Sequence, residues 1–577
     1  MTGLHPLTLP LAAAAPLLLA MLWPARACRA ATVWLTPGAA LPALLVALLM
    51  PEGATVEGRW LLLGARFGLD GTGQTFLFFT ALLWGVGAVF GRSYLARDAT
   101  RDRFFLFYLL AMAGNFGLIM AFDAPVFYCC FALMSFASYG LVIHNGDAEA
   151  LRAGRIYIYL VVLGEVLLFA ALVTIVGATG STRLPVAADA PLRPLTVGLA
   201  VADGDWRRPA AAKMCGYALA QVRCATPTSA VLSGAMIKAG VIGWLRFLPW
   251  GQTPQPAWGS LLLLLGLAGA FFGVVVGLTQ RNPKTVLAYS SISQMGLITL
   301  ALGAGLVAPE HWPAAQTAVL LYALHHGLAK GALFLGVGVA QATGAHGRGW
   351  TVAGLLLPAL ALAGAPWTSG AIAKSALKAG LGALPGAWAE WLAVLLPVSA
   401  VGTTLLMARF LVLVWPRESG RGHLTAGMAL PWLGLRGAVA VPLVGWPSAV
   451  GREGTTFDTS KAWSSAWPVL AGALVGWVAW KWGAPRARLP VIPAGDLLAV
   501  VERVSHSLRS HLSRRGFGRV WTRAVGGAAA ALRRAAGNLE ATLPERRCGR
   551  SLQRWPVAGG VFLLLIVVLA LLLTPLR

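Results

Sequence analysis

The residues best suited to chemistry in this chain are lysines and histidines set within long apolar stretches. Lys238 has about seven mostly apolar residues on each side, and Glu165 is the one carboxylate deep in an apolar run. His326 and Lys330 are four residues apart, a spacing that puts both on one face of a helix. Because a charged side chain at the centre of a bilayer costs roughly 3 kcal/mol on insertion scales, groups of this kind indicate a function.

Other lysines stand beside residues that interrupt helices. Lys284 follows Pro283, and Lys374 and Lys378 follow the segment Gly364–Gly370. We expect these interruptions to free backbone carbonyls that face a polar cavity. An amine withdrawn from water loses its proton more easily, and a nearby carboxylate opposes this effect. A row of such groups can relay protons or couple ion movement to a distant event. A single lysine could equally join helices by binding carbonyls, but four lysines with a buried histidine favour the relay.

The elements that must hold these groups are membrane helices. Of 577 residues, 57% are hydrophobic and 12% charged, with a mean hydropathy of +0.71. A helix needs about 20 apolar residues to cross a bilayer, and its backbone amides must be satisfied internally. Runs of about that length lie at about 31–50, 72–91, 104–122, 124–143, 156–177, 258–279 and 557–573. We predict an all-α membrane protein with about 14–16 transmembrane helices.

The chain divides into four expected regions. Residues 1–100 hold N-terminal transmembrane helices, 101–415 the core with the ionisable groups, 416–483 additional helices, and 484–577 a basic segment and a final helix. The apolar stretch 7–23 lacks a basic flank, so we expect a retained span rather than a signal peptide. Arginines at 26–29, 92–103 and 152–155 place those loops in the cytoplasm and the N-terminus outside.

The formal charge of +25 has two interpretations, nucleic-acid binding and contact with anionic lipid. Nucleic-acid binding would need a soluble basic domain, whereas the basic residues here lie in short loops and in Leu497–Leu539. That segment is predicted to be an amphipathic helix on the membrane or on a neighbouring subunit, with a solvated linker as the alternative. The six cysteines form no CxxC pair, and no Rossmann or Walker motif is present, so no cofactor or metal is expected in this chain.

Five stretches resemble the antiporter-like subunits of respiratory complex I, of Mrp cation/proton antiporters and of membrane-bound hydrogenases. These stretches are Leu63–Asp70, Asp123–Tyr139, Ala225–Gly240, Lys284–Gly296 and Leu362–Lys374. The resemblance covers about residues 60–415 and implies two inverted five-helix repeats, each with a broken helix and half of an ion path. It also implies a multi-pass subunit of a multisubunit complex in the bacterial inner membrane.

By position, the resemblance assigns a role to each buried cation. It implies that Lys238 is the central lysine of the first half and that Lys284 connects the two halves. His326 and Lys330 would continue the path, and Lys374 would end it. The chain would then be a translocase-type subunit of a complex such as an NADH:quinone oxidoreductase, with the redox centres on other subunits.

Two departures from the family pattern keep other functions open. Ala132 stands where the family usually has a glutamate, so the usual partner of Lys238 is missing, and we hypothesise that Glu165 replaces it. Asp203–Tyr217 does not match the lysine and Pro-x-His-x-Trp-Leu-Pro pattern expected there. Both features motivate a non-conducting structural subunit as the alternative to a proton or sodium translocator. An independent solute transporter is disfavoured, because the buried polar groups are mostly lysine and histidine.

Overall fold

The computed structural model describes residues 4–58, 64–186, 224–251, 254–343, 347–382, 384–415, 424–440, 462–479 and 481. All of these residues, and every helix and strand named below, lie within one compact unit, Met1–Ala499. Three predicted features lie outside the described residues: the segment Asp203–Tyr217, the amphipathic helix Leu497–Leu539 and the final span 557–573. The division of the chain into four regions stays a prediction.

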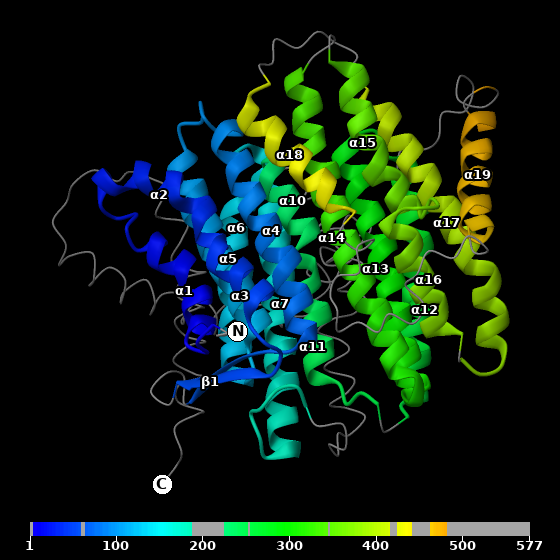
Figure 1. The fold of residues 1–577 in the computed structure, drawn as a ribbon, viewed down its shortest axis with the longest axis horizontal. Coiled ribbons are helices and arrows are strands. Elements are labelled where there is room, and N and C mark those ends of the chain that lie inside the picture. The colour runs from blue at the N-terminus through cyan, green and yellow to red at the C-terminus, as the bar shows by residue number, and fades with distance from the viewer. Residues whose placement is uncertain are drawn as a thin grey trace, which may run out of the picture. The chain divides into compact units, whose positions relative to one another are not determined.

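Apolar helices make up most of the described chain (Figure 1). Ten segments are long and apolar enough to cross a membrane: Arg26–Leu49 (η1 Arg26–Cys28, α2 Arg29–Leu35, η2 Thr36–Ala40, α3 Leu41–Leu49), α4 Gly71–Tyr94, α5 Arg101–Met120, α6 Ala124–Val142, α7 Ala148–Thr179, Thr226–Phe247 (α10 Thr226–Gly234, η3 Met236–Lys238, α11 Ala239–Phe247), α12 Pro256–Thr279, α13 Pro283–Val307, Pro309–Thr343 (η4 Pro309–His311, α14 Trp312–Thr343) and α17 Ala387–Val414. The remaining helices are α1 Thr8–Ala20, α15 Arg348–Ala363, α16 Ser369–Leu381, α18 Ala426–Ala438 and α19 Ala462–Val478. The all-α membrane class is confirmed, while the full number of spans and the inverted relation of the repeats stay predictions.

A short hairpin is the exception to the helices within the described ranges. Strand β1 (Ala54–Gly58) pairs antiparallel with β2 (Ala65–Leu69), with Val56 opposite Phe67. β-branched and aromatic side chains fit such a half-buried pleated surface. The hairpin leads directly into Asp70, the residue that caps α4.

Short polar side chains begin four of the helices. Asp70, Asp123 and Asp147 each accept a hydrogen bond from the amide three residues on, and Asn282 from the amide two residues on. Such caps satisfy a donor that the first turn of a helix leaves free. Pro283 follows Asn282 at the first position of α13, where a proline needs no amide partner. The expectation that Pro283 breaks a helix is therefore wrong, because it starts one.

Helices α13 and α14 form the enclosed centre of the described bundle. The most apolar windows of these two spans are 94% and 100% buried, against 33% for α7. Helix α12 packs closely on α13 through Gly259, Gly266 and Gly273, which are seven residues apart. A Cβ at these positions would lie 2.8, 2.7 and 2.5 Å from backbone carbonyl oxygens of α13. Small residues at such a crossing allow two backbones to approach, as is common between membrane helices.

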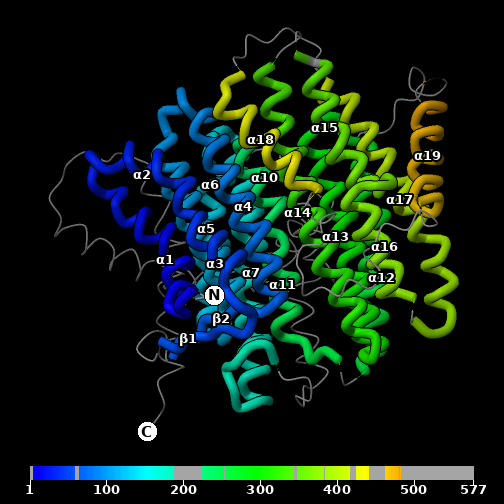
Figure 2. Tube along the Cα trace, in the orientation of Figure 1, coloured from blue at the N-terminus to red at the C-terminus, as the bar shows by residue number. Residues whose placement is uncertain are grey.

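Two helical segments are interrupted, and Figure 2 follows the chain through both. The first segment changes from α10 to the 3-10 turn η3 and then to α11. The second stops at the end of α15 and resumes as α16, with Gly364 at a φ of 85° and Trp367 at a φ of 58° between them. The interruption at Gly364–Gly370 was expected from the sequence, and the one within Ala225–Gly240 agrees with the broken helix that the resemblance implied for each repeat.

Candidate functional site

Lys238 is the last residue of η3, the 3-10 turn of the first interruption. Its side chain is buried, and its Nζ donates a hydrogen bond to the carbonyl oxygen of Ser233 at 2.8 Å. Ser233 belongs to the last turn of α10, where carbonyls have no further turn to bind and carry partial negative charge. The interruption therefore supplies an acceptor for the lysine amine.

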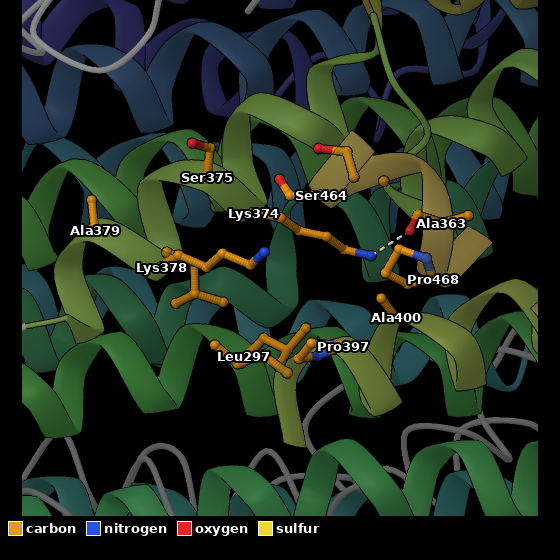
Figure 3. A pocket seen from close by; sticks show the side chains of 14 residues that line it. Leu297, Ala363, Lys374, Ser375, Lys378, Ala379, Pro397, Ala400, Ser464 and Pro468 are labelled. Atoms are coloured by element: carbon orange, nitrogen blue, oxygen red, sulfur yellow. Dashed lines mark hydrogen bonds between the residues drawn. The ribbon is translucent and has the colours of Figure 1, made fainter. Parts of the chain in front are cut away.

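Lys374 repeats this arrangement at the second interruption. Its Nζ donates to the carbonyl oxygen of Ala363, the last residue of α15 (Figure 3). The side chain crosses directly over Gly364, where a Cβ would lie 2.6 Å from Cδ of Lys374. In both halves of the chain, a lysine that follows the end of the first half-helix thus binds the carboxyl end of that half-helix.

A cavity of about 430 Å³ adjoins Lys374. Lys378, one helical turn further along α16, also lines it, together with Ser375 and, from α19, Ser464 (Figure 3). Apolar residues of α13, α17 and α19 complete the wall. The second interruption therefore brings two lysines to one partly polar cavity, as their spacing in the sequence suggests.

A series of hydrogen bonds connects Lys238 with Lys330 on α14. The Nζ of Lys330 donates to the carbonyl oxygen of Leu287 on α13 at 2.7 Å. Ser291 donates to the same oxygen at 3.0 Å, and its Oγ lies 2.7 Å from the Oγ of Ser233. Since Lys238 binds the backbone of Ser233, the two lysines are joined through one residue of α10 and two of α13.

Two adjacent histidines of α14 have different surroundings. His326, a predicted site residue, is fully buried, and neither ring nitrogen has a hydrogen-bond partner among the described residues. His325, which the sequence reasoning missed, has its Nδ1 2.9 Å from the Oγ of Ser369 on α16. The adjacent positions of the two histidines in one apolar stretch were the sequence signal that could have identified His325 as a second candidate site residue.

A second polar group, also missed from the sequence, joins three helices near these histidines. The hydroxyl of Tyr322 on α14 donates to Oε1 of Gln294 on α13 at 2.7 Å. Nε2 of Gln294 donates to Oγ1 of Thr403 on α17 at 3.1 Å. Uncharged polar residues of this kind are common in membrane helices, and no feature of their spacing distinguishes them.

Lys284 lies at the edge of the bundle rather than at its centre. Its Nζ donates to the carbonyl oxygen of Cys224 at 3.0 Å. It lines a mainly polar cavity of about 460 Å³ together with Asp98, Asn145 and Asp147. These polar residues come from two of the loops predicted to be cytoplasmic, so Lys284 stands between a polar cavity and the lysines of the interior.

A histidine–aspartate pair lies beside this cavity, outside the predicted spans. Nε2 of His144 is 3.0 Å from Oδ2 of Asp98. Burial by itself would raise the pKa of Asp98, but hydrogen bonds from Thr100 and His144 outweigh it, and this pKa lies below its usual value. Burial lowers the pKa of His144, and Asp98 offsets only part of that effect. At neutral pH the pair therefore consists of a neutral imidazole and a carboxylate.

The hypothesis that Glu165 replaces the missing glutamate as partner of Lys238 is not supported by a contact between the two side chains. Glu165 is buried on α7, and Ala132 is buried on the neighbouring α6. Among the described residues Lys238 forms no ion pair with a carboxylate and binds a backbone carbonyl instead. The role of Glu165 therefore stays a hypothesis. Within the same ranges, no group of three or more His, Cys, Asp or Glu side chains could hold a metal ion.

The fold and the buried lysines define a multi-pass helical membrane protein with two interrupted helices. Residues 121–403 match the family described as NADH:quinone oxidoreductase/Mrp antiporter, transmembrane. The resemblance seen in the sequence is confirmed.

Similar curated proteins come from several kinds of complex. Hydrogenase-4 component B of Escherichia coli (strain K12) is 29% identical over an alignment 307 residues long, which covers 49% of this chain and 45% of that protein. NADH-quinone oxidoreductase subunit N of Polaromonas naphthalenivorans (strain CJ2) is 30% identical over 280 residues, 46% of this chain and 56% of that protein. The matched part of the chain thus spans about half the length of these two relatives.

A solved structure shares the fold. A chain in the structure of the Mrp complex from Dietzia sp. DQ12-45-1b superimposes with a TM-score of 0.72 at 23% sequence identity. The match covers 98% of this chain and 66% of that chain.

Proposed function

We propose that this chain is a proton- or sodium-translocating membrane subunit of a multisubunit complex of the complex I, Mrp or hydrogenase type. Its relatives are named as subunits or components of such assemblies, which supports this class of function. We further propose that it resides in a bacterial inner membrane, contacts anionic lipid through its basic segment, and relies on other subunits for redox chemistry.

The observation that carries the proposal is the repeated contact between a lysine and a helix end. Lys238 and Lys374 each bind the last turn of an interrupted helix, and Lys330 is on α14, which packs against both α10 and α16. A carbonyl carries only partial negative charge, so it can hold an amine in either protonation state, whereas a carboxylate would favour the charged form. The proposed path begins at the polar cavity beside Lys284, instead of passing from one half to the other there as the resemblance implied, and ends at Lys374.

His326 adds support because its burial is costly. A buried polar atom without a hydrogen-bond partner costs about 1–3 kcal/mol, so a ring with two such nitrogens gives no benefit to stability. Function is the better reason for placing it four residues from Lys330, on the same face of α14. The proposal assigns His326 to the relay between the two halves.

A non-conducting structural subunit is the second candidate, and two observations favour it. Ala132 removes the usual carboxylate, and every lysine of the proposed path binds a carbonyl, as a lysine that only joins helices would. The two functions differ in what neutral replacements do. A structural subunit tolerates loss of charge at Lys238 while transport continues, whereas a translocating subunit does not.

The test is ion flux in inverted membrane vesicles that contain the complete complex. We expect Lys238→Met, which keeps the volume and removes the charge, to abolish flux while the complex stays assembled. Glu165→Gln should do the same if Glu165 replaces the missing glutamate. Lys481→Ala is the matched control, since that lysine is exposed. Unchanged flux in both site variants would mean that the first half is scaffold. Solute uptake by the isolated chain, reconstituted alone, would instead support an independent transporter.

A further inference from the structure

His325 and Ser369 join two helices at the second interruption. Nδ1 of His325 lies 2.9 Å from Oγ of Ser369, and both side chains are buried. His325 is on the central helix α14, whereas Ser369 is the first residue of α16. The contact therefore ties the half-helix that carries Lys374 to the helix that carries Lys330.

The backbone just before Ser369 needs support from its surroundings. Gly364 has a φ of 85° and Trp367 a φ of 58°, and a non-glycine residue in this region costs of order 1–3 kcal/mol. The side chain of Trp367 is 67% exposed, so its own packing does not provide that support. Thr368 does not cap α16, because its hydroxyl donates back to the carbonyl of Ala365. Ser369 is thus the place where a side chain of another helix holds this segment.

The start of α16 also has no room to move toward α15. A Cβ at Gly370 would lie 1.7 Å from the carbonyl oxygen of Ala361 and 3.2 Å from Cε1 of His325. The first turn of α16 is therefore enclosed between the end of α15 and the imidazole ring.

We propose that His325 is a positioning residue for Lys374. Its hydrogen bond to Ser369 holds α16 so that the amine of Lys374 stays at the carbonyl of Ala363, within the path that continues from Lys330. Losing the bond lets α16 shift and interrupts transfer in the second half of the chain. The inference rests on the proposed function, because Lys374 is the last group of that path.

Two replacements of similar shape separate a hydrogen-bonding role from other roles. Asparagine at 325 places a hydrogen-bonding atom where Nδ1 stands but cannot take up a proton, while leucine has the same branching and no polar atom. In vesicles with the complete complex, we expect His325→Asn to keep flux and His325→Leu and Ser369→Ala to lower it about tenfold. A tenfold loss corresponds to about 1.4 kcal/mol, close to one buried hydrogen bond. Thr351→Val is the control, since the hydroxyl of Thr351 is buried and donates to the carbonyl of Gly347, the residue that caps its own helix α15.

A second measurement follows the position of α16 directly. Ser375 lines the cavity beside Lys374, so S375C in a variant without the native cysteines reports on α16 through its rate of alkylation by a membrane-permeant maleimide. We expect His325→Leu to change this rate at least threefold relative to His325→Asn. A loss of flux that came only from poor folding would lower assembly of both variants instead.

The possible results distinguish the positioning role of His325 from the proposed ion-translocating function. Equal flux and equal alkylation in the Asn and Leu variants overturn the positioning role of His325. Loss of flux in His325→Asn also overturns it, because a proton-carrying ring would then be required. Full flux in Lys374→Met counts against the proposed function in this half of the chain, and the alkylation rates still decide whether His325 positions α16.

Discussion

The hydroxyl pair of Ser233 and Ser291 provides the sharpest test of the ion path. These two side chains connect the first interruption with α13, and the oxygen of Leu287 that accepts from Ser291 also accepts from Lys330. We expect Ser291→Ala to lower ion flux at least tenfold, a loss of about 1.4 kcal/mol in transfer, because it removes the hydroxyl that bridges α10 and α13.

The structural cost of this substitution is small enough for the complex to survive. Ser291→Ala removes two hydrogen bonds, at 2.7 and 3.0 Å, each worth about 1 kcal/mol net. The higher helix propensity of alanine offsets up to about 0.5 kcal/mol of this loss of stability. The oxygen of Leu287 keeps its bond to Lys330. The expected loss of stability is therefore about 1–2 kcal/mol, to be checked by thermal unfolding of the purified complex.

The assay is the initial rate of ion uptake into inverted vesicles at matched amounts of complex. The double variant of Ser233→Ala and Ser291→Ala should lose no more than Ser291→Ala alone, because both changes remove one link. Thr299→Ala is the control on the same helix, since the hydroxyl of Thr299 donates within α13. The reasoning is refuted if Ser291→Ala transports as well as the Thr299→Ala control, or if the losses of the two single variants multiply.

Three further predictions concern stability and pH, each measured by thermal unfolding of the purified complex. Gly364→Ala should destabilise by about 1–3 kcal/mol, because φ is 85° and a lysine side chain crosses this position, whereas Gly177→Ala, in open space on α7, should not. Arg246→Met should cost about 3 kcal/mol, because it removes two bonds of 2.6 and 2.9 Å to Asp70. Burial lowers the pKa of His144, so its contribution to stability should be present above about pH 6.5 and be lost as the pH falls further, and His144→Gln should reduce that loss.

Each of these expectations has a result that would contradict it. Equal midpoints for the two glycine variants would mean that the backbone at 364 tolerates a side chain. An Arg246→Met midpoint within 1 °C of wild type would mean that the ion pair contributes nothing net. The acid-induced loss below about pH 6.5 would have another origin if His144→Gln showed it unchanged.

Much of the fold follows from local features of the sequence. The apolar runs predicted at 72–91, 104–122, 124–143 and 258–279 correspond to α4, α5, α6 and α12 to within a few residues at either end. Lengths near 20 apolar residues leave little alternative in lipid, where the backbone must bond to itself. The interruption at Gly364 was equally readable, since glycine is the residue that adopts a positive φ without strain. Pro283 was misread, because the same residue type interrupts a helix from within and begins one at its first position.

The candidate site was likewise predicted from the sequence only in part. Charge inside an apolar run marked Lys238, Lys330 and Lys374 from composition and spacing alone, and the structure brings all three to carbonyls of neighbouring segments. No sequence pattern marked Ser291 as a connection, and the pair His325–His326 was the one signal for His325. Hydroxyls are common in membrane helices, and their importance here depends on which helix faces them.

Residue types and their order are therefore enough to indicate a helical membrane protein that resembles this family, with interrupted helices and buried lysines. The partners of those lysines were decided by packing. The backbone of every residue carries the same carbonyl oxygen. The sequence therefore does not indicate that Ser233, Leu287 and Ala363 provide the acceptors. This choice of acceptors arises because the crossing of α10, α13 and α15 with their neighbours leaves those oxygens, and no others of the described residues, in hydrogen-bonding reach of the three amines.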